Sequence, residues 1–315
     1  MTRWARIAAV CSPEYNQIPM KSLKSVLELP VEEAVFRLSM WAHRPNNTSD
    51  LSHRPATFSL DAYTEWRSSG LRENFDKFFE RRVLENRRVC DFGCGGGELS
   101  LLAADYGASR VIGTDLNERF IREAKQRAKG HNNVEFVLET DDARISLPDT
   151  SVDVILCFDV VEHIMAYEQI FHEWRRVLAP YGHVLIWWSV WWHPYGHHLQ
   201  TMMPLPWIHV FMSDHAMLRV AARIYDRPEF RPRFWHFDDQ GQRVPNPYRN
   251  APFRNINKLT IRSFENSVTT AGLRVVRRDV IPFTGKLVAI KRLLSRSPLR
   301  DFFCACVIYE LERGA

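Results

Sequence analysis

The first part of the chain is polar, and its apolar residues are spaced as they are on one face of a helix. Between Val31 and Trp41, apolar residues recur every three or four positions. A second stretch, Asp61–Arg82, carries aromatic and leucine residues at similar spacing. A segment rich in Pro, Asn, Ser and His, Arg44–Pro55, separates the two. We therefore expect an N-terminal helical cap over residues 1–87.

Apolar runs alternate with amphipathic stretches from residue 88 onward. Seven of these runs have the length and composition of strands. They cover residues 88–92, 110–114, 134–138, 152–158, 183–188, 273–281 and 302–311. Helical spacing lies between most of them, and this alternation favours a parallel, doubly wound α/β sheet.

The alternation pauses between residues 190 and 257, a segment longer than an ordinary loop. We expect a lid insertion there, between the fifth and sixth strands. The sheet domain then consists of residues 88–189 and 258–315. Within the insertion, Met202–Tyr225 is apolar and partly helical. We interpret this part as a substrate lid or a homodimer contact, with a peripheral membrane contact as the remaining alternative.

Charge is distributed unevenly, although the overall composition is ordinary. With 45% hydrophobic and 25% charged residues, the chain has the composition of a globular protein. No Asp, Glu, Lys or Arg occurs from Val177 to Ser213, whereas residues 219–300 carry 18 Lys and Arg against 6 Asp and Glu. Prolines and histidines inside the uncharged stretch argue against a membrane-spanning helix. Six scattered cysteines without a CxxC pair are typical of a cytoplasmic protein.

A glycine-rich turn follows the first predicted strand and precedes a helix. Its sequence is Asp91-Phe92-Gly93-Cys94-Gly95-Gly96-Gly97. The glycines let the backbone approach a ligand beside the free N–H groups of a helix N-terminus. Glu98 stands where a dinucleotide-binding GxGxxG turn needs its third glycine. The carboxylate of Asp91 repels a pyrophosphate but can hold an ammonium group, and Asp115 after the second strand can accept from ribose hydroxyls.

With these features the chain resembles the class I S-adenosylmethionine-dependent methyltransferases. The resemblance runs from about Tyr63 to Leu311, apart from the insertion. The matching segments are Val89–Gly97, Asp115–Leu116, Asp142–Ala143, Leu147–Asp153 and Phe158–His163, and residues 259–281 and 302–311 fit the family's antiparallel final strand pair.

The resemblance implies a Rossmann-like, seven-stranded methyltransferase sheet and S-adenosyl-L-methionine as the cofactor. Either of the adjacent Asp141 and Asp142 can be the partner of the adenine amino group. The implied cofactor contacts are Asp91, Gly93, Cys94, Gly95, Gly97, Asp115, Leu116, Asp142, Ala143, Phe158, Asp159 and His163.

Three residues keep two interpretations each. Tyr63 and Trp66 of the predicted cap either cover the cofactor or pack in the core. His163 lies close to the expected methyl acceptor, where it can act as a catalytic base. However, a similar Glu-His pair occurs in family members with different substrates. This favours a structural or cofactor-supporting role for His163.

The insertion begins with a run of tryptophans and histidines, Trp187–His198. In a first interpretation this run lines a substrate pocket at the end of the fifth strand, and one histidine is a base or orients the acceptor. In a second, its histidines bind a metal ion together with a carboxylate from Asp159 or Glu162. In a third, the tryptophans pack the lid and the histidines satisfy backbone groups. We expect the pocket, with no resident metal. The expected substrate walls are Trp191, Trp192, Tyr195 and Trp207, and the candidate catalytic histidines are His193, His197 and His198.

The expected function is methylation of a small or medium organic molecule on O, N or C. A lipid methyltransferase lying on a membrane and a nucleic-acid methyltransferase are the alternatives. The fourth strand is followed by Phe158-Asp159-Val160 rather than by a Pro-Pro-Tyr motif, which argues against a nucleic-acid substrate. Eight arginines suggest an anionic acceptor, although solvated surface charge is the simpler explanation. They are Arg219, Arg223, Arg227, Arg231, Arg233, Arg243, Arg249 and Arg254.

Overall fold

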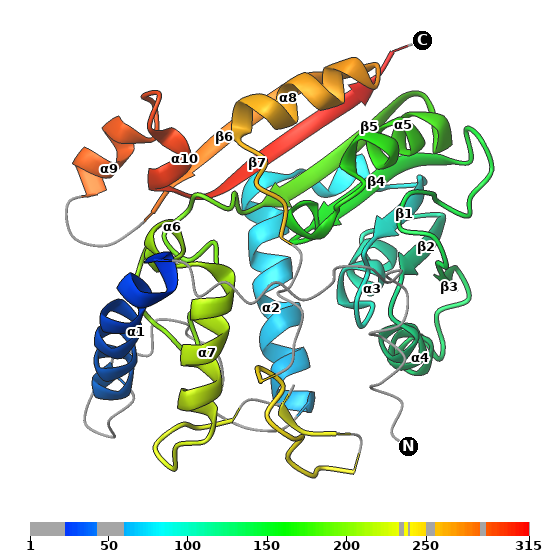
Figure 1. The fold of residues 1–315 in the computed structure, drawn as a ribbon. Coiled ribbons are helices and arrows are strands. Elements are labelled where there is room, and N and C mark those ends of the chain that lie inside the picture. Colours follow the sequence, from blue (N-terminus) through cyan, green and yellow to red (C-terminus); the bar gives the residue numbers. More distant parts are fainter. Residues whose placement is uncertain are drawn as a thin grey trace.

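A seven-stranded sheet forms the centre of the computed structural model (Figure 1), which describes residues 23–42, 60–232, 236–238, 240–249, 256–283 and 288–314. The strand order is β3-β2-β1-β4-β5-β7-β6. Strands β1 to β5 run parallel, whereas β7 is antiparallel to both β5 and β6. The strands are β1 Arg88–Phe92, β2 Arg110–Asp115, β3 Val134–Leu138, β4 Val152–Phe158, β5 Leu178–Trp188, β6 Leu273–Pro282 and β7 Cys304–Arg313.

This order confirms the expected doubly wound sheet with an antiparallel final pair. The main difference is at β5, which begins at Leu178 rather than at His183 because its first residue already pairs with Val152 of β4. No described helix combines the length and apolarity needed to cross a bilayer. The helices are α1 Leu23–Ala42, α2 Leu60–Phe78, α3 Glu98–Asp105, α4 Glu118–Arg127, α5 Tyr167–Val177, α6 Ile208–Phe211, α7 Asp214–Tyr225, α8 Ile261–Thr270, α9 Val288–Leu294 and α10 Arg300–Phe303, with 3₁₀ turns η2 Arg81–Val83 and η3 Val161–His163.

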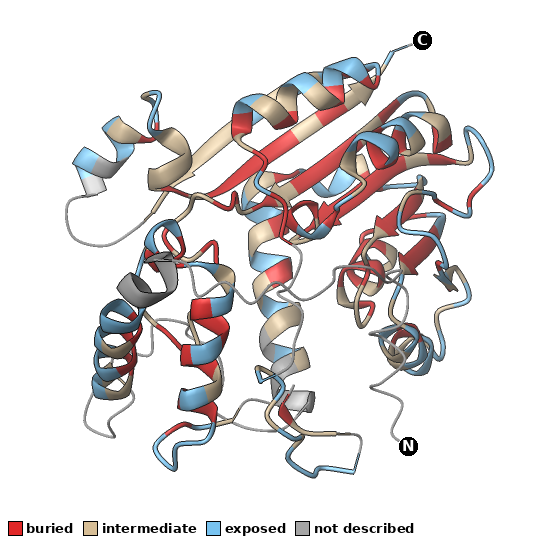
Figure 2. Cartoon of the chain, in the orientation of Figure 1, coloured by how far each residue is buried: buried red, intermediate tan, exposed pale blue. Residues whose placement is uncertain are grey.

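Helices cover both faces of the sheet, so its central strands are buried along their length (Figure 2). In β4, Val154 and Leu156 join a hydrophobic cluster that contains residues of α2 and α3. The intervening Ile155 and Cys157 join a second cluster, with residues of α5 and α8. A strand covered on both faces needs apolar residues at successive positions, which explains the continuous apolar run in the sequence.

The two N-terminal helices pack in different places, although a single helical cap was expected from the sequence. Helix α2 packs against α3 on the sheet. Helix α1 instead contacts α7 of the insertion, and Phe36 of α1 shares a separate hydrophobic cluster with Met202, Met217 and Ile224. Helices α1 and α7 therefore form one helical unit at the lower left of Figure 1.

Most described arginines of the insertion serve this helical unit. Arg219 of α7 pairs with Glu32 of α1 at 2.5 Å, and Arg223 pairs with Glu33 at 2.8 Å. The guanidinium of Arg223 also lies 4.0 Å from the ring centre of Phe36, with Arg227 nearby. Further along, Arg243 stacks on Tyr225 and Arg249 pairs with Asp226. The basic character of this segment is thus used largely inside the chain.

The Glu32–Arg219 pair is expected to contribute measurably to stability. The side chain of Glu32 is only 6% exposed, whereas that of Arg219 is 50% exposed and remains hydrated if its partner is lost. We expect Glu32→Gln to lower the free energy of unfolding by about 1–2 kcal/mol in urea denaturation. The half-exposed Glu33 provides a matched control, since Glu33→Gln is expected to cost clearly less than Glu32→Gln. Equal losses in the two variants would contradict this ranking.

Candidate functional site

The glycine-rich turn between β1 and α3 requires its glycines for conformational and steric reasons. Gly93, Gly95 and Gly97 all have positive φ angles, of 72°, 53° and 85°. A Cβ atom on Gly93 would lie 2.6 Å from a methyl group of Val160. A Cβ atom on Gly95 would meet nothing within 4 Å, and this residue lines a cavity. The turn therefore presents bare backbone to a ligand.

Asp91 lies beneath this turn at the end of β1. Its residue surface is only 2% exposed, and its carboxylate accepts a hydrogen bond of 2.6 Å from the Ser100 hydroxyl. Burial raises the pKa of Asp91 to about 7, and the nearby Glu98 and Asp115 carboxylates act in the same direction. A cation that binds here would favour the ionised form of Asp91.

Asp115 connects the end of β2 to the glycine turn and to α4. One carboxylate oxygen accepts from the Gly95 N–H at 2.9 Å, and the other accepts from the Asn117 N–H at 2.8 Å. Each oxygen keeps a second lone pair that can accept from a ligand hydroxyl. Asn117 caps α4 by accepting from the Arg119 N–H.

The two adjacent acids after β3 differ in what they contact. The Asp141 carboxylate accepts from the Ala143 N–H at 2.8 Å and so shapes its own turn. Both acids are exposed and line the cavity, so the hydrogen bond made by Asp141 is the difference between them. Ala143 is not among the lining residues, so its contribution is the backbone N–H that Asp141 holds.

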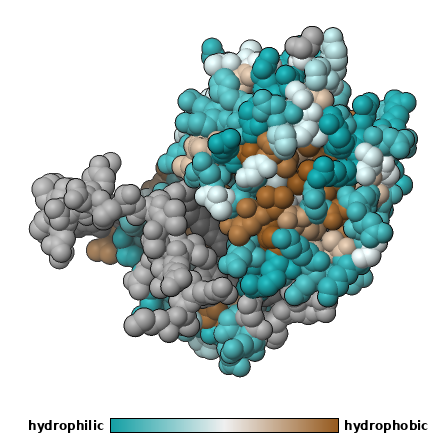
Figure 3. Space-filling view, turned by 90° about the vertical axis from the view of Figure 1, so that its right-hand side faces the viewer, coloured by the Kyte–Doolittle hydropathy of each residue, from teal (hydrophilic) through white to brown (hydrophobic). Residues whose placement is uncertain are grey.

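Apolar side chains lie beside these acids. Leu116 and Phe120 line the cavity and are 56% and 39% exposed. Figure 3 faces the side of the molecule that lies on the right in Figure 1, and there apolar surface gathers in one area between hydrophilic regions. An apolar rim next to carboxylates suits a ligand that combines a flat ring with hydroxyl groups.

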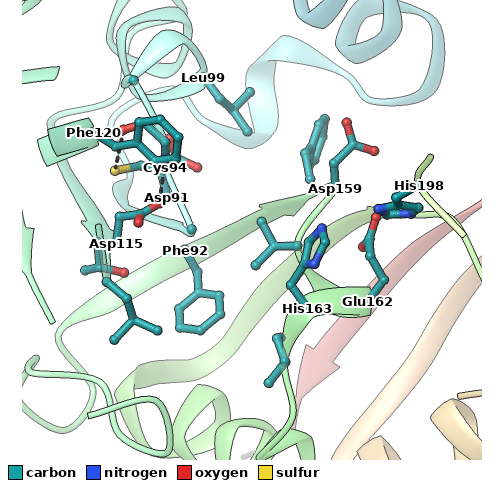
Figure 4. A pocket seen from close by; sticks show the side chains of 18 of the residues that line it. Asp91, Phe92, Cys94, Leu99, Asp115, Phe120, Asp159, Glu162, His163 and His198 are labelled. Carbon is teal, nitrogen blue, oxygen red and sulfur yellow. Dashed lines mark hydrogen bonds between the residues drawn. The ribbon is translucent and has the colours of Figure 1, made fainter. Parts of the chain in front are cut away.

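A single cavity of about 880 Å³ joins the glycine turn to the ends of β4 and β5 and to the insertion. In Figure 4, Asp91, Cys94, Asp115 and Phe120 lie on one side of it, and a second group of polar side chains lies across from them. The lining residues include the predicted Asp91, Gly93, Cys94, Gly95, Asp115, Leu116, Asp142, Phe158, Asp159, His163, His193, Tyr195 and His198. Gly97 instead packs beneath the turn, close to Phe136. Tyr63 lies in α2, and its side chain is outside the described part of the chain.

The second group follows β4. Asp159 has a positive φ of 56°, and its carboxylate pairs with Arg67 of α2 at 2.8 Å. Glu162 is 2% exposed, and burial, together with the nearby Asp159 carboxylate, raises its pKa well above the ordinary value. The rings of His163 and His198 lie 5.2 Å apart. A carboxylate and two imidazoles therefore meet at this end of the cavity.

The other two predicted catalytic histidines are held by the insertion's own backbone. His193 lines the cavity, and its Nδ1 accepts from the Tyr195 N–H at 2.8 Å. Burial lowers the pKa of His193 to about 4, so the ring is neutral at pH 7 and carries its proton on Nε2. Such a ring is a hydrogen-bond donor to a ligand rather than a base. The Nδ1 of His197 accepts from the Leu199 N–H, and this ring is buried and does not line the cavity.

Three of the four predicted aromatic walls lie away from the cavity, and only Tyr195 lines it. Trp191 is buried against Trp192 and His209. The Trp207 ring contacts Phe303 of α10. These tryptophans pack the insertion against the rest of the chain, as in the third interpretation of the run.

Several lining residues were not singled out as site residues from the sequence. Arg67 comes from α2, and Ser189, Gln200, Thr201 and Tyr248 come from the end of β5 and the insertion. None belongs to a motif, so only the spatial arrangement brings them to the site. Glu162 was noted as part of a motif and as one of two carboxylates available to a metal, and its proximity to His198 depends on the fold of the insertion.

The sequence of the central segment matches a known family. Residues 90–186 match the family model described as a methyltransferase domain. A relative from Mycolicibacterium smegmatis, named as a probable S-adenosylmethionine-dependent methyltransferase, is 38% identical over 104 residues, which are 32% of this chain and 37% of the relative. A ubiquinone biosynthesis O-methyltransferase from Leptothrix cholodnii is 33% identical over 105 residues, which are 33% of this chain and 44% of the relative.

The chain thus spans about two fifths of the length of these curated relatives. A solved S-adenosylmethionine-dependent methyltransferase from Mesorhizobium loti covers 81% of this chain and 100% of its own, with 19% identity and a TM-score of 0.47. The class assignment therefore rests on the family match, the strand order and the glycine turn. Together they define a class I S-adenosylmethionine-dependent methyltransferase domain, and S-adenosylmethionine is the cofactor of that class.

Proposed function

We propose that this protein transfers a methyl group from S-adenosylmethionine to a hydroxyl group of a small organic molecule. The observation that carries the proposal is the single cavity, which connects the glycine turn to the polar group after β4. Its volume lies within the range of small-molecule sites, about 300–1,000 Å³. One ligand can therefore meet a second without leaving the cavity.

The residues on the glycine-turn side fit the cofactor. The buried Asp91 carboxylate suits the ammonium group of the methionine part. The remaining lone pairs of Asp115 suit ribose hydroxyls, and Asp142 suits the adenine amino group. The cofactor supplies an activated methyl group on a sulfonium. The protein's task is to align the acceptor with that methyl group and to exclude water.

The residues on the other side suit an acceptor with a hydroxyl group. Such an acceptor carries a proton that must leave, and Glu162, His163 and His198 meet where that proton can be taken up. His193 can donate from Nε2 to an acceptor oxygen. The name of the Leptothrix relative, which describes O-methylation in ubiquinone biosynthesis, also supports an oxygen acceptor.

Product analysis tests this function. The protein is incubated with S-adenosylmethionine and matched aromatic acceptors that carry a hydroxyl, an amino or a carboxyl group, and products are measured by mass spectrometry. We expect a methylated product, with S-adenosylhomocysteine in equal amount, from the hydroxyl acceptors only. Asp115→Asn, which weakens the cofactor site, is expected to remove this product. Methylation of amines or carboxylates alone would contradict the proposed acceptor, and no turnover with any member of the panel would contradict the proposed function.

A further inference from the structure

Three metal-ligating side chains converge at the end of the cavity opposite the glycine turn. They are Glu162 and His163 of η3, and His198 of the insertion. One ligand atom from each lies within 4.8 Å of the other two. The two rings stand at 74° to each other, and Figure 4 shows the Glu162 carboxylate beside them. Because these residues come from segments far apart in sequence, the group exists only in the folded chain.

Glu162 provides a second, independent observation. Its residue surface is 2% exposed, and its Oε2 has no hydrogen-bond partner among the described residues. A buried carboxylate oxygen without a partner is costly unless a cation or a donor satisfies it. Arg67 pairs with the neighbouring Asp159. A cation beside the buried Glu162 oxygen would satisfy that oxygen and favour the ionised form of the carboxyl group.

We propose that Glu162, His163 and His198 form a binding site for a divalent transition-metal ion. Two imidazoles and one carboxylate suit Zn²⁺, and a fourth position stays open to an outside ligand, as in catalytic zinc sites. Magnesium and calcium prefer all-oxygen ligand sets, so the imidazoles select against them. Tetrahedral bonds of about 2.0–2.1 Å place ligand atoms about 3.4 Å apart, which small side-chain rotations achieve from the observed spacing.

If the proposed function holds, a bound metal ion would also assist methyl transfer by acting on the acceptor hydroxyl. With the three side chains occupied as ligands, the group no longer takes up the acceptor proton itself. The Lewis acid beside the acceptor hydroxyl favours its ionised form instead, and the proton is released to solvent. The oxygen then forms a bond to the methyl carbon while the carbon–sulfur bond breaks. The electron pair of that bond stays on sulfur, and S-adenosylhomocysteine leaves as the second product. The +2 charge of the ion is balanced by the Glu162 carboxylate and the ionised acceptor oxygen.

Metal binding itself can be measured without any substrate. The 315-residue chain is stripped with a chelator, and Zn²⁺ binding is followed by competition with a chromophoric zinc indicator. We expect one ion per chain, and at least a tenfold weaker affinity in both Glu162→Gln and His198→Ala. His215→Ala is the matched control because His215 is exposed on α7 and outside the group, and it should bind Zn²⁺ like the parent protein. Binding of S-adenosylhomocysteine by each variant checks that the fold and the glycine turn are intact.

A second readout concerns geometry. Co²⁺ bound in place of Zn²⁺ is expected to give the intense visible absorption of a four-coordinate ion, and His198→Ala should remove it. Absence of stoichiometric Zn²⁺ binding, or equal binding by the parent protein and by both ligand variants, would overturn the proposal and leave a hydrogen-bonded cluster without a metal. Stoichiometric binding without methyl transfer to any acceptor would overturn only the proposed function, so the two failures are distinguishable.

Discussion

Replacing Asp91 by Asn is expected to weaken the binding of S-adenosylhomocysteine by about 10- to 100-fold at pH 8, because the ligand's ammonium group loses a charged partner. Asn keeps the shape of the side chain, and its amide oxygen can still accept from the Ser100 hydroxyl. The loss therefore reports charge rather than a collapsed turn. Isothermal titration calorimetry of both proteins in the same buffer measures it.

The same carboxylate predicts a pH dependence of binding. Because burial raises the pKa of Asp91 to about 7, the unliganded carboxyl group is largely neutral at pH 6 and largely ionised at pH 8. The affinity of the parent protein for S-adenosylhomocysteine is thus expected to increase across this range. The affinity of the Asn variant should stay nearly constant. A flat profile in the parent protein would contradict this role of Asp91.

Stability without ligand should change in the opposite direction. The pKa of Asp91 in the folded state lies above its ordinary value of 3.8, so the unfolded chain releases this proton first. Asp91 therefore makes the unliganded protein less stable as the pH rises from about 4 to about 7. At pH 8 the Asn variant should be the more stable protein without ligand and the weaker binder with it.

Removing the hydroxyl in Ser100→Ala raises the pKa of Asp91 further, because that hydrogen bond lowers it. The rise in affinity is then displaced to higher pH.

The strands were predictable because each is an apolar run with a physical reason to be one. β4 faces helices on both sides, so its residues cannot alternate with polar ones. The start of β5 was not predictable in the same way. Pro180, Tyr181 and Gly182 interrupt its hydrophobic pattern, and only the pairing of Leu178 with Val152 reveals the earlier start. Pairing between strands is a tertiary contact that a local pattern does not contain.

The cofactor half of the site was predictable because it is built from local motifs. The turn from Asp91 to Gly97 and the acid at Asp115 each follow directly from a strand, so sequence spacing determines their place. The acceptor half depends on how the insertion folds. His198 reaches His163, whereas the neighbouring His197 is buried away from the cavity. The sequence of neighbouring histidines does not reveal which ring will line the cavity. That depends on the backbone conformation of the folded insertion.

The arginines of the insertion show that charge partners, too, cannot be predicted from the sequence alone. Their excess in the insertion suggested an anionic acceptor, with solvated surface charge as the simpler explanation. The carboxylates that Arg219 and Arg223 meet are those of Glu32 and Glu33. Those acids lie almost two hundred positions earlier in the chain. Counting charge by segment cannot reveal such pairing, because complementary segments are joined only by the fold.

Replacing Gly97 by Ala is expected to lower the free energy of unfolding by about 2–5 kcal/mol. Gly97 is the N-cap of α3 and has a φ of 85°, a conformation that costs an L-residue about 1–2 kcal/mol. Its new Cβ would also lie 2.7 Å from Cζ of Phe136 and 3.0 Å from Cβ of Ala124. Overpacking of this kind costs about 1–3 kcal/mol more, because β3 and α4 must move. Urea denaturation without ligand measures the total.

Gly107 separates the two contributions. Its φ of 84° nearly equals that of Gly97, but the nearest atom to a Cβ there is Cγ of Glu85 at 3.7 Å, an ordinary contact. Gly107→Ala should therefore show the backbone cost alone, about 1–2 kcal/mol. The difference between the two variants measures how tightly the turn is packed against β3. Equal losses of unfolding free energy in Gly97→Ala and Gly107→Ala would mean that the turn can move away from Phe136 without cost. The packing of Gly97 against Phe136 would then not determine where the turn lies beside the cavity.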